Sequence, residues 1–249
     1  MIKIDLNSDL GEGAGTEAAI MPLITSANIA CGAHAGDERS MREAVALAKA
    51  NGVAVGAHPG YRDPANFGRK PLEISADALV GDLVAQIEAL LAIASSENVP
   101  VAHVKAHGAL YNTAQRDESV AAAIVRAVEH SARGLILFVF PGSAVERAGR
   151  AAGLRVAREG FIDRAYEPDG ALRSRTHADS LITDPGRAAA QAVSFMRDGG
   201  VRAHDGSFLE QAVDTLCVHG DTPGAADILR AARAALVSAG VRVERLRAG

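Results

Sequence analysis

The feature that most constrains the fold is an alternation of short aliphatic runs with longer amphipathic segments. The runs are typical of buried strands, and the segments between them carry apolar residues at helical spacing. Strands are expected at residues 2–6, 24–30, 53–58, 101–107, 135–140, 155–162, 215–219 and 241–246. Helices are expected to begin near Glu38 and after Ser75, and to cover 118–130, 144–152, 185–197 and 225–238. This order predicts right-handed crossovers and a parallel sheet, either closed into a barrel or doubly wound.

Length and composition favour the barrel. The chain has 249 residues, which α/β barrels commonly occupy as one unit, so residues 1–249 are expected to form a single domain. Hydrophobic residues make up 48% of the chain but aromatic ones only 4%, so aliphatic side chains and alanine must fill the core. No GxGxxG follows the first strand and no GxxxxGK[ST] occurs, which argues against both common nucleotide-binding loops. We predict an α/β barrel with fewer or less regular strands than eight.

The charge balance bounds the partners. The formal net charge is −4, and no basic run is interleaved with aromatics, so nucleic acid is not an expected partner. No apolar stretch follows a basic segment at the start, and nowhere do eighteen apolar residues run together. We therefore expect no membrane span and a cytoplasmic protein. The two cysteines are too few for a disulfide framework and are expected as free thiols.

Reactive side chains follow nearly every expected strand. In chain order they are Asn7, Asp9 and Glu12, then Asn28, Cys31 and His34, then His58, Lys105, His107, Asp163, Arg164, His219 and Asp221. The carboxyl ends of parallel strands meet at one mouth, where active sites lie. One histidine at a strand end is more often a hydrogen-bonding residue than a catalyst. Several at the same rim predict a shared polar site.

Three local patterns leave alternatives open. Cys31, His34, Cys217 and His219 could form a structural zinc site, but their spacing lacks paired knuckle geometry. A catalytic metal held by histidines and a carboxylate stays possible. Asp37 is either a site residue or the cap of the helix that follows it. The irregular stretch 163–183 is either a lid or a plain surface loop.

Six sequence blocks carry a resemblance to a known family. They are IDLNSDLGEG, NIACGAHAGD, GVAVGAHPGYRDPANFGR, VKAHGALYN, the DRAY segment and CVHGDTPGA. In this order, from residue 2 to about 240, they resemble the LamB/YcsF family. The resemblance implies a distorted barrel of about seven parallel strands, similar to the polysaccharide deacetylase-like barrel. It also implies ATP-dependent opening of 5-oxoproline to L-glutamate together with two further subunits, B and C. Ala33 departs from a usual aromatic residue, and Ala106 from a usual proline.

Opening a lactam requires a base for water, a proton donor for the ring nitrogen and cations for an oxyanion or phosphate. The candidate catalytic residues, with roles undivided, are Asp9, His34, His58, Lys105, His107, His219 and Asp221. The candidate substrate-binding residues are Asn7, Asn28, Asn112, Asp163 and Arg164. Since no phosphate loop is present, ATP is expected to bind with or on the partner subunits. The alternatives are a metal-dependent deacetylase or amidohydrolase acting without ATP, and a small-ligand binding protein.

Overall fold

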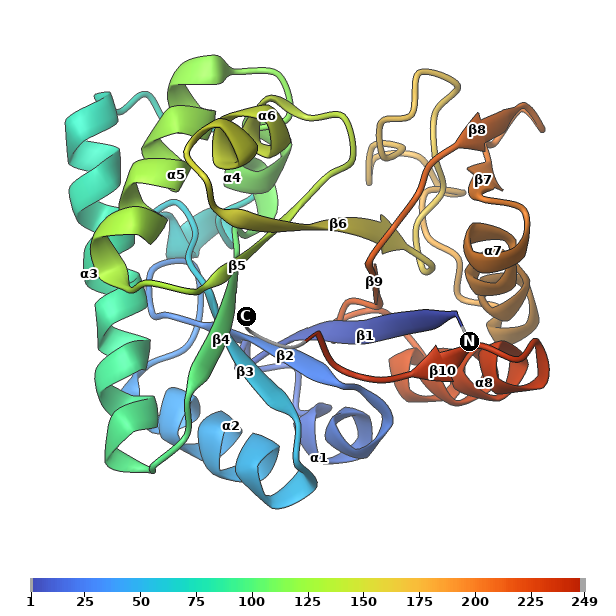
Figure 1. Cartoon of the computed structure of the whole chain (residues 1–249), viewed down its shortest axis with the longest axis horizontal. Helices are drawn as coiled ribbons and strands as arrows, with labels where there is room; N and C mark the ends of the chain where they lie inside the picture. The colour runs from blue at the N-terminus through green and yellow to red at the C-terminus, as the bar shows by residue number, and fades with distance from the viewer. Residues whose placement is uncertain (1, 247–249) are drawn as a thin grey trace.

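The protein is a closed parallel barrel surrounded by helices. The structure, a computed structural model, describes residues 2–246 (Figure 1). The strands are β1 (Lys3–Leu10), β2 (Ser26–Ala30), β3 (Ala54–His58), β4 (Val101–Lys105), β5 (Ile136–Val139), β6 (Arg155–Phe161), β9 (Thr215–Cys217) and β10 (Arg242–Val243). They are ordered β10-β1-β2-β3-β4-β5-β6-β9, and β1 also pairs with β9. Seven strands thus close the barrel, which confirms the predicted fold class.

Helices cover the outside of the barrel (Figure 1). The long ones are α2 (Glu38–Asn51), α3 (Ala76–Ser96), α5 (Glu118–Ser131), α6 (Ala144–Ala151), α7 (Pro185–Arg197) and α8 (Ala225–Ser238). The short ones are α1 (Glu17–Ile20), α4 (Gly108–Thr113) and the 3-10 turns η1 (Met21–Leu23) and η2 (Pro64–Asn66). The side chains of Asp37 and Ser75 accept hydrogen bonds from the first turns of α2 and α3, so both are N-caps.

Strand β1 extends beyond the predicted residues 2–6 because its polar side chains face the barrel interior. Asn7 and Asp9 belong to the strand itself, and both are buried. Alternate residues of a strand share a face, so these two side chains point the same way. Strand β9 pairs with β1 at Asn7 and Cys217, and with β6 at Glu159 and Thr215. Closure therefore places residues from both ends of the chain side by side.

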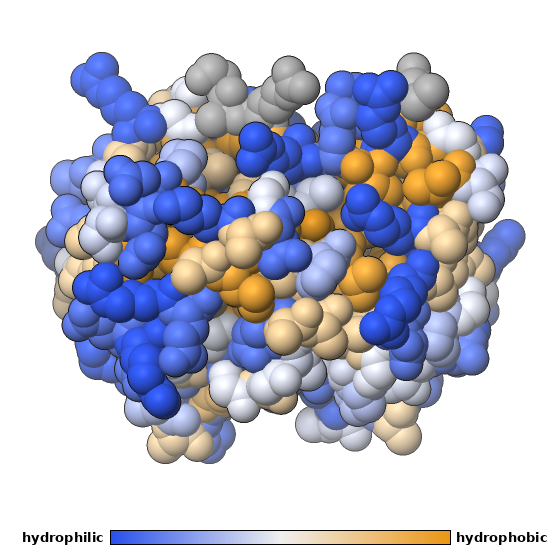
Figure 2. Space-filling model, turned by 90° about the horizontal axis from the view of Figure 1, so that it is seen from below, coloured by the Kyte–Doolittle hydropathy of each residue, from blue (hydrophilic) through white to orange (hydrophobic). Residues whose placement is uncertain are grey.

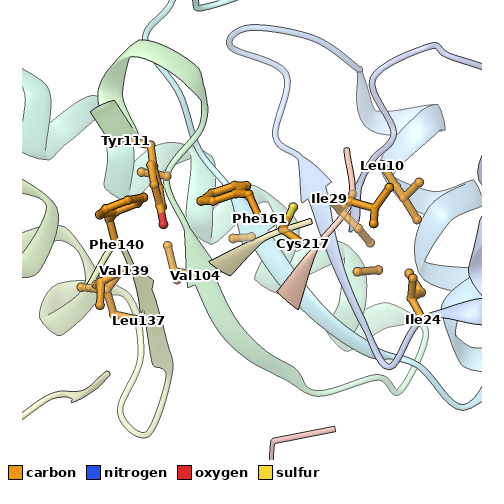
Figure 3. Packing of buried hydrophobic residues seen from close by; sticks show 14 of the residues in the cluster. Leu10, Ile24, Ile29, Val104, Tyr111, Leu137, Val139, Phe140, Phe161 and Cys217 are labelled. Carbon is orange, nitrogen blue, oxygen red and sulfur yellow. The ribbon is translucent and has the colours of Figure 1, made fainter. Parts of the chain in front are cut away.

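The main apolar core lies between the strands and the surrounding helices, on the strand faces opposite the side chains that point into the barrel. Figure 3 shows Leu10, Ile24 and Ile29 packed at one end of a cluster that continues through Val104, Leu137 and Val139. Phe140 and Phe161 stack with ring centroids 6.4 Å apart, and Tyr111 meets Phe161 edge-on at 5.8 Å. The hairpin of β7 (Gly200–Arg202) and β8 (Phe208–Glu210) lies outside the barrel and was not predicted. Its strands are too short to give a period.

Helix α3 is the one helix among residues 2–246 that is long and apolar enough, by length and composition alone, to cross a membrane. Its buried side chains, which include Leu83, Ile87 and Leu90, belong to the core cluster of the barrel. Packing therefore accounts for its apolar face. Figure 2 shows another face of the molecule, where apolar side chains near the centre are bordered by hydrophilic ones.

Candidate functional site

A cavity of about 500 Å³ lies at the carboxyl ends of β1, β3, β4, β6 and β9. Among the predicted site residues, its wall contains Asp9, His58, Lys105, His107, Asn112, Arg164, His219 and Asp221. The volume is that of a small-molecule site. Residues that lie up to 212 positions apart in the sequence thus share one cavity, as the positions of polar residues at the strand ends predicted.

Four predicted residues lie beneath the cavity instead of lining it: Asn7, Asn28, His34 and Asp163 are buried and absent from its wall. Asn28 donates to Asp9 Oδ1 and to Asn7 Oδ1, each at 2.8 Å. Asn7 in turn donates to the Thr215 hydroxyl at 2.8 Å. The structure places both asparagines behind the cavity wall, and their role in binding a substrate stays a prediction. Their hydrogen bonds orient the carboxylate of Asp9, which does line the cavity.

Lys105 provides a fixed positive charge at the base of the cavity. Its Nζ lies 2.8 Å from Asp9 Oδ1, 2.9 Å from Glu159 Oε1 and 3.1 Å from Cys217 Sγ. Burial alone would lower the pKa of Lys105, but attraction to Asp9 and other neighbours holds it well above its ordinary value. Burial would likewise raise the pKa of Asp9, yet His58 and Lys105 hold it well below the ordinary value. Both groups are therefore ionised.

Glu159 is a site residue that the sequence analysis missed. It is fully buried in β6, and its carboxylate lies beside the Tyr111 hydroxyl. Burial and the negative charge of Glu159 raise the pKa of Tyr111 well above its ordinary value. The signal was present as period-two alternation: Ala157, Glu159 and Phe161 occupy one face of the strand. A glutamate on the inward face of a barrel strand needs a cation, and Lys105 supplies it.

Asp163 fixes the orientation of the His219 imidazole. The two residues are here called the Asp163 pair. His219 Nδ1 lies 2.9 Å from Asp163 Oδ2, which also accepts from the His219 backbone N–H at 3.0 Å. The Thr222 hydroxyl donates to the same oxygen at 2.7 Å. Burial would raise the pKa of Asp163, but His219 and the hydrogen bonds lower it to about 2. The carboxylate therefore holds a proton on Nδ1 and leaves Nε2 as the acceptor.

Glu12, His34, His58 and His107, here called the Glu12 cluster, bring one carboxylate to three imidazoles. Glu12 Oε1 lies 3.0 Å from His34 Nε2, 3.2 Å from His107 Nδ1 and 3.6 Å from His58 Nε2. The ligating atoms of all four lie within 4.8 Å of one another, the separation expected for groups that hold a metal ion. Glu12 was noted close behind the first strand but was not among the predicted site residues.

The imidazoles of the Glu12 cluster have unlike protonation. Burial lowers the pKa of His34 to about 4 and also lowers the pKa of His107, although the carboxylate of Glu12 beside each of them acts in the opposite direction. Burial would lower the pKa of His58 as well, but Asp9 and Glu12 raise it. Burial would raise the pKa of Glu12, but His107 and His34 lower it. His34 and His107 are therefore neutral at pH 7, and Glu12 is ionised.

Arginine side chains line another part of the cavity. Arg69 pairs with Asp221, and Arg175 Nη2 lies 3.9 Å from the same carboxylate. Arg164 donates through Nε to the Ser180 carbonyl at 3.3 Å and through Nη2 to the Arg173 carbonyl at 2.6 Å. Burial, followed by repulsion from Arg175, lowers the pKa of Arg164 to about 10. This part of the cavity favours an anionic ligand.

The irregular stretch 163–183 contributes to the cavity wall. It is fastened by bridges between Arg164 and Leu181 and between Tyr166 and Leu172, and it adds Ala171 to Arg175 to the lining. Whether it moves as a lid stays a prediction. The four-residue zinc arrangement is absent among residues 2–246: Cys31 donates to the Ile29 carbonyl, and the close groups of possible ligands do not include it. Both cysteines are buried free thiols.

The comparisons with known proteins agree on one family. The family model described as "LamB/YcsF family" matches residues 4–249. A relative from Symbiobacterium thermophilum, named as a 5-oxoprolinase subunit, is 52% identical over 246 residues, which cover 97% of this chain and 94% of the relative. The crystal structure of a lactam utilization protein from Thermus thermophilus superposes with a TM-score of 0.92 at 46% identity, covering 98% of this chain and all of that one.

A more distant match bears on the fold alone. A family 4 carbohydrate esterase from Streptomyces lividans superposes with a TM-score of 0.50 at 9% identity, covering 98% of this chain and 93% of that one. The barrel is thus shared with deacetylase-like enzymes, as the resemblance implied.

Proposed function

The chain belongs to the LamB/YcsF family, and from this premise we propose that it hydrolyses a cyclic amide, 5-oxoproline, to L-glutamate. Relatives about as long as this chain are named as subunits of 5-oxoprolinase. The observation that carries the proposal is that one cavity of about 500 Å³ joins a carboxylate-held imidazole, a fixed ammonium and guanidinium groups. These are the groups that opening an anionic lactam requires.

Arg164 is the group assigned to the substrate carboxylate. Asp221 partly compensates Arg69 and Arg175, whereas Arg164 forms no ion pair with a carboxylate among residues 2–246. Its two backbone acceptors fix the plane of the guanidinium before a ligand arrives. A guanidinium held in this way can bind a carboxylate through parallel hydrogen bonds. Asn112, also in the wall, supplies an amide for the ring.

His219 is the group assigned to proton transfer. Its Nδ1 is engaged by Asp163, and a ring nitrogen lies within 4.8 Å of a carboxylate oxygen of Asp9. In the proposed step Nε2 takes a proton from water, and the water oxygen forms a bond to the lactam carbonyl carbon. The ammonium of Lys105 stabilises the negative oxygen that results. The carbon–nitrogen bond of the ring then breaks, and the ring nitrogen receives the proton from His219.

We further propose that ATP activates the lactam. The five-membered amide is unstrained and resonance-stabilised, so its carbonyl carbon is a poor electrophile. Transfer of the terminal phosphoryl group to the amide oxygen would release ADP. After water adds to the activated carbon, the ring carbon–nitrogen bond would break and leave an acyl phosphate, which a second water would hydrolyse to L-glutamate and phosphate. Since the sequence contains no phosphate loop, ATP is assigned to, or shared with, partner subunits B and C. The reaction is assigned to the cytoplasm, where ATP is available.

The test is a reconstituted assay. The chain is purified alone and with the partner subunits, 5-oxoproline is supplied with and without ATP, and glutamate and ADP are measured. His219→Asn and Lys105→Met should each lower the rate of glutamate formation by at least about 10²-fold, whereas His130→Ala, on the exposed side of α5, should leave the rate unchanged. A complex that forms no glutamate contradicts the function. Wild-type rates in both site variants contradict the assigned roles.

The Glu12 cluster favours a second candidate, a metal-dependent amidohydrolase or deacetylase that acts without ATP. Its histidines and carboxylate match the donor set of hydrolytic metal centres. The same assay separates the two candidates. Product formation by the chain alone, independent of ATP and lost on chelation, supports the second candidate. Turnover that requires ATP and the partner subunits supports the first.

A further inference from the structure

Three atoms of the Glu12 cluster are spaced like the ligand atoms of a small cation. His58 Nε2 lies 3.0 Å from His107 Nδ1, and Glu12 Oε1 lies 3.2 Å from His107 Nδ1 and 3.6 Å from His58 Nε2. A zinc-sized ion has bonds of about 2.0 to 2.2 Å, which set neighbouring ligand atoms roughly 3.0 to 3.5 Å apart. Calcium, with longer bonds, would need wider separations.

Hydrogen bonds to the backbone fix the ring nitrogens that face each other. His58 Nδ1 lies 2.8 Å from the Lys105 carbonyl, and His107 Nε2 lies 2.9 Å from the Phe67 carbonyl. A carbonyl oxygen only accepts, so both of these nitrogens carry hydrogen. In the neutral rings the two remaining nitrogens then present lone pairs to each other at 3.0 Å. Such a contact requires a positive charge between them, either a proton or a metal ion.

We propose that Glu12, His58 and His107 bind a divalent transition-metal ion of the size of zinc. Glu12 forms no ion pair with a lysine or arginine in the part of the chain that the structure describes, and its close ion-pair partners there are imidazoles. Backbone carbonyls that hold the far nitrogen of a ligating imidazole are the usual outer partners of such sites. Asp9 Oδ2, 3.4 Å from His58 Nε2, adds negative charge beside it.

His34 is a positioning residue and not a fourth ligand. Its ring stacks on His107 with centroids 3.7 Å apart and planes 3° apart. An ion in the plane of one ring would lie well outside the plane of the other, so the two rings cannot both ligate it well. His34 Nε2 instead donates to Glu12 Oε1 at 3.0 Å and orients the carboxylate.

The second close group of possible ligands already contacts a cation. It consists of Asp9, Cys217 and His219. The Lys105 ammonium lies 2.8 Å from Asp9 Oδ1 and 3.1 Å from Cys217 Sγ. A metal ion there would have to displace a buried, paired ammonium. The Glu12 cluster contains no such group, which is why it is the site proposed.

The test is metal binding by the full chain, measured without turnover, so that its outcome is separate from that of the proposed function. Chelator-treated protein is titrated with Zn²⁺ and, in parallel, with Co²⁺, and metal content after dialysis is measured. We expect about one equivalent per chain. The Co²⁺ complex should show visible d–d absorption without a thiolate charge-transfer band, because the ligands are nitrogen and oxygen.

Substitutions in the Glu12 cluster should weaken metal binding to different extents. Glu12→Gln and His107→Asn should weaken binding beyond the roughly 10- to 100-fold that follows loss of an outer partner, which is the loss expected for His34→Gln. Cys217→Ser, in the competing group, and exposed His130→Ala should bind like the wild type. Less than stoichiometric metal in the wild type, a thiolate band, or unchanged affinity in folded Glu12→Gln would each overturn the proposal. The first result would identify a bridging proton. If a ligand variant fails to fold, the wild-type Co²⁺ spectrum still decides.

Discussion

The Glu12 cluster and the Asp163 pair lie at the same cavity but differ in how many imidazoles each carboxylate contacts. In the Asp163 pair one carboxylate serves one imidazole, and the backbone N–H of His219 and the Thr222 hydroxyl also donate to it. In the Glu12 cluster one carboxylate serves three imidazoles, and two ring nitrogens face each other. Within the described part of the chain, His34 Nδ1 is buried without a hydrogen-bond partner.

The difference fits the two roles proposed above, proton transfer for the Asp163 pair and metal binding for the Glu12 cluster. A single imidazole with one nitrogen fixed and the other free can take up and release a proton. In His58 and His107, one nitrogen of each ring is bonded to a backbone carbonyl and the other faces the partner ring, so neither ring has a free nitrogen. The His219 side chain is 15% exposed, whereas that of His34 is fully buried. The Asp163 pair thus reaches the cavity through His219, and the Glu12 cluster reaches it through Glu12, His58 and His107.

The largest expected effect falls on catalysis. His219→Asn in the reconstituted complex should lower kcat by roughly 10²- to 10⁴-fold, the contribution of a positioned acid–base group, with KM little changed. His34→Gln should lower kcat less, because His34 does not line the cavity. Steady-state kinetics for both variants measure the contrast. Equal losses would show that the Asp163 pair is not the distinct proton carrier.

The next effect is a loss of folding stability in acid, caused by His34 of the Glu12 cluster. Burial lowers the pKa of His34 to about 4 from 6.5. Between these values the unfolded chain binds the proton and the folded chain does not, so stability falls as pH falls through this window. In chelator-treated protein the loss attributable to His34 should be about 3 kcal/mol. Urea unfolding from pH 7 to pH 4 measures it, and His34→Gln should show a shallower slope. Parallel slopes for the two proteins would contradict the assignment.

The stability contributed by the Asp163 pair should be lost at a lower pH than that contributed by His34. The pKa of Asp163 falls from 3.8 to about 2, so the stability it contributes is present above 3.8 and is lost as pH falls through 2. The contribution is about 2 to 3 kcal/mol. The difference in unfolding free energy between the wild type and Asp163→Asn should be constant near neutrality and shrink toward pH 2. If this difference already shrank between pH 6 and 5, the Asp163 pair would lose its contribution before the Glu12 cluster, contrary to the prediction.

A smaller effect should come from the backbone beneath the Glu12 cluster. A Cβ at Gly60 would lie 2.9 Å from His34 Nδ1 and 3.2 Å from His107 Cβ. Gln86 of α3 exchanges two hydrogen bonds of 2.9 Å with the Gly60 backbone, so the loop cannot easily retreat. Gly60→Ala should cost about 1 to 3 kcal/mol. It should weaken Zn²⁺ binding and leave the acid transition of Asp163 in place. Thermal denaturation and zinc titration measure both, with Gly81→Ala, where no described atom crowds the added carbon, as the control.

The sequence alone determined the order of strands and helices. Apolar residues at periods of two and 3.6 indicate which segments are strands and helices, and this holds for β2 to β6 and for the six long helices. It also placed His58, Lys105 and His107 at strand ends, because the carboxyl ends of parallel strands share one side. Whether residues 1–249 act as one domain stays a prediction.

Only the tertiary structure decided which of these side chains touch. Closure of β9 between β6 and β1 brings Cys217 and Glu159 to Lys105, and no local pattern specifies that pairing. Glu12 and His34 lie in glycine-containing loops without a period, and the direction of His34 depends on the packing of Gly60 and Gly68 against it. The orientation of each imidazole depends on carbonyls distant in sequence, those of Phe67 and Lys105. Residue type sets the available chemistry, but hydrogen bonds between distant segments select which nitrogen performs it.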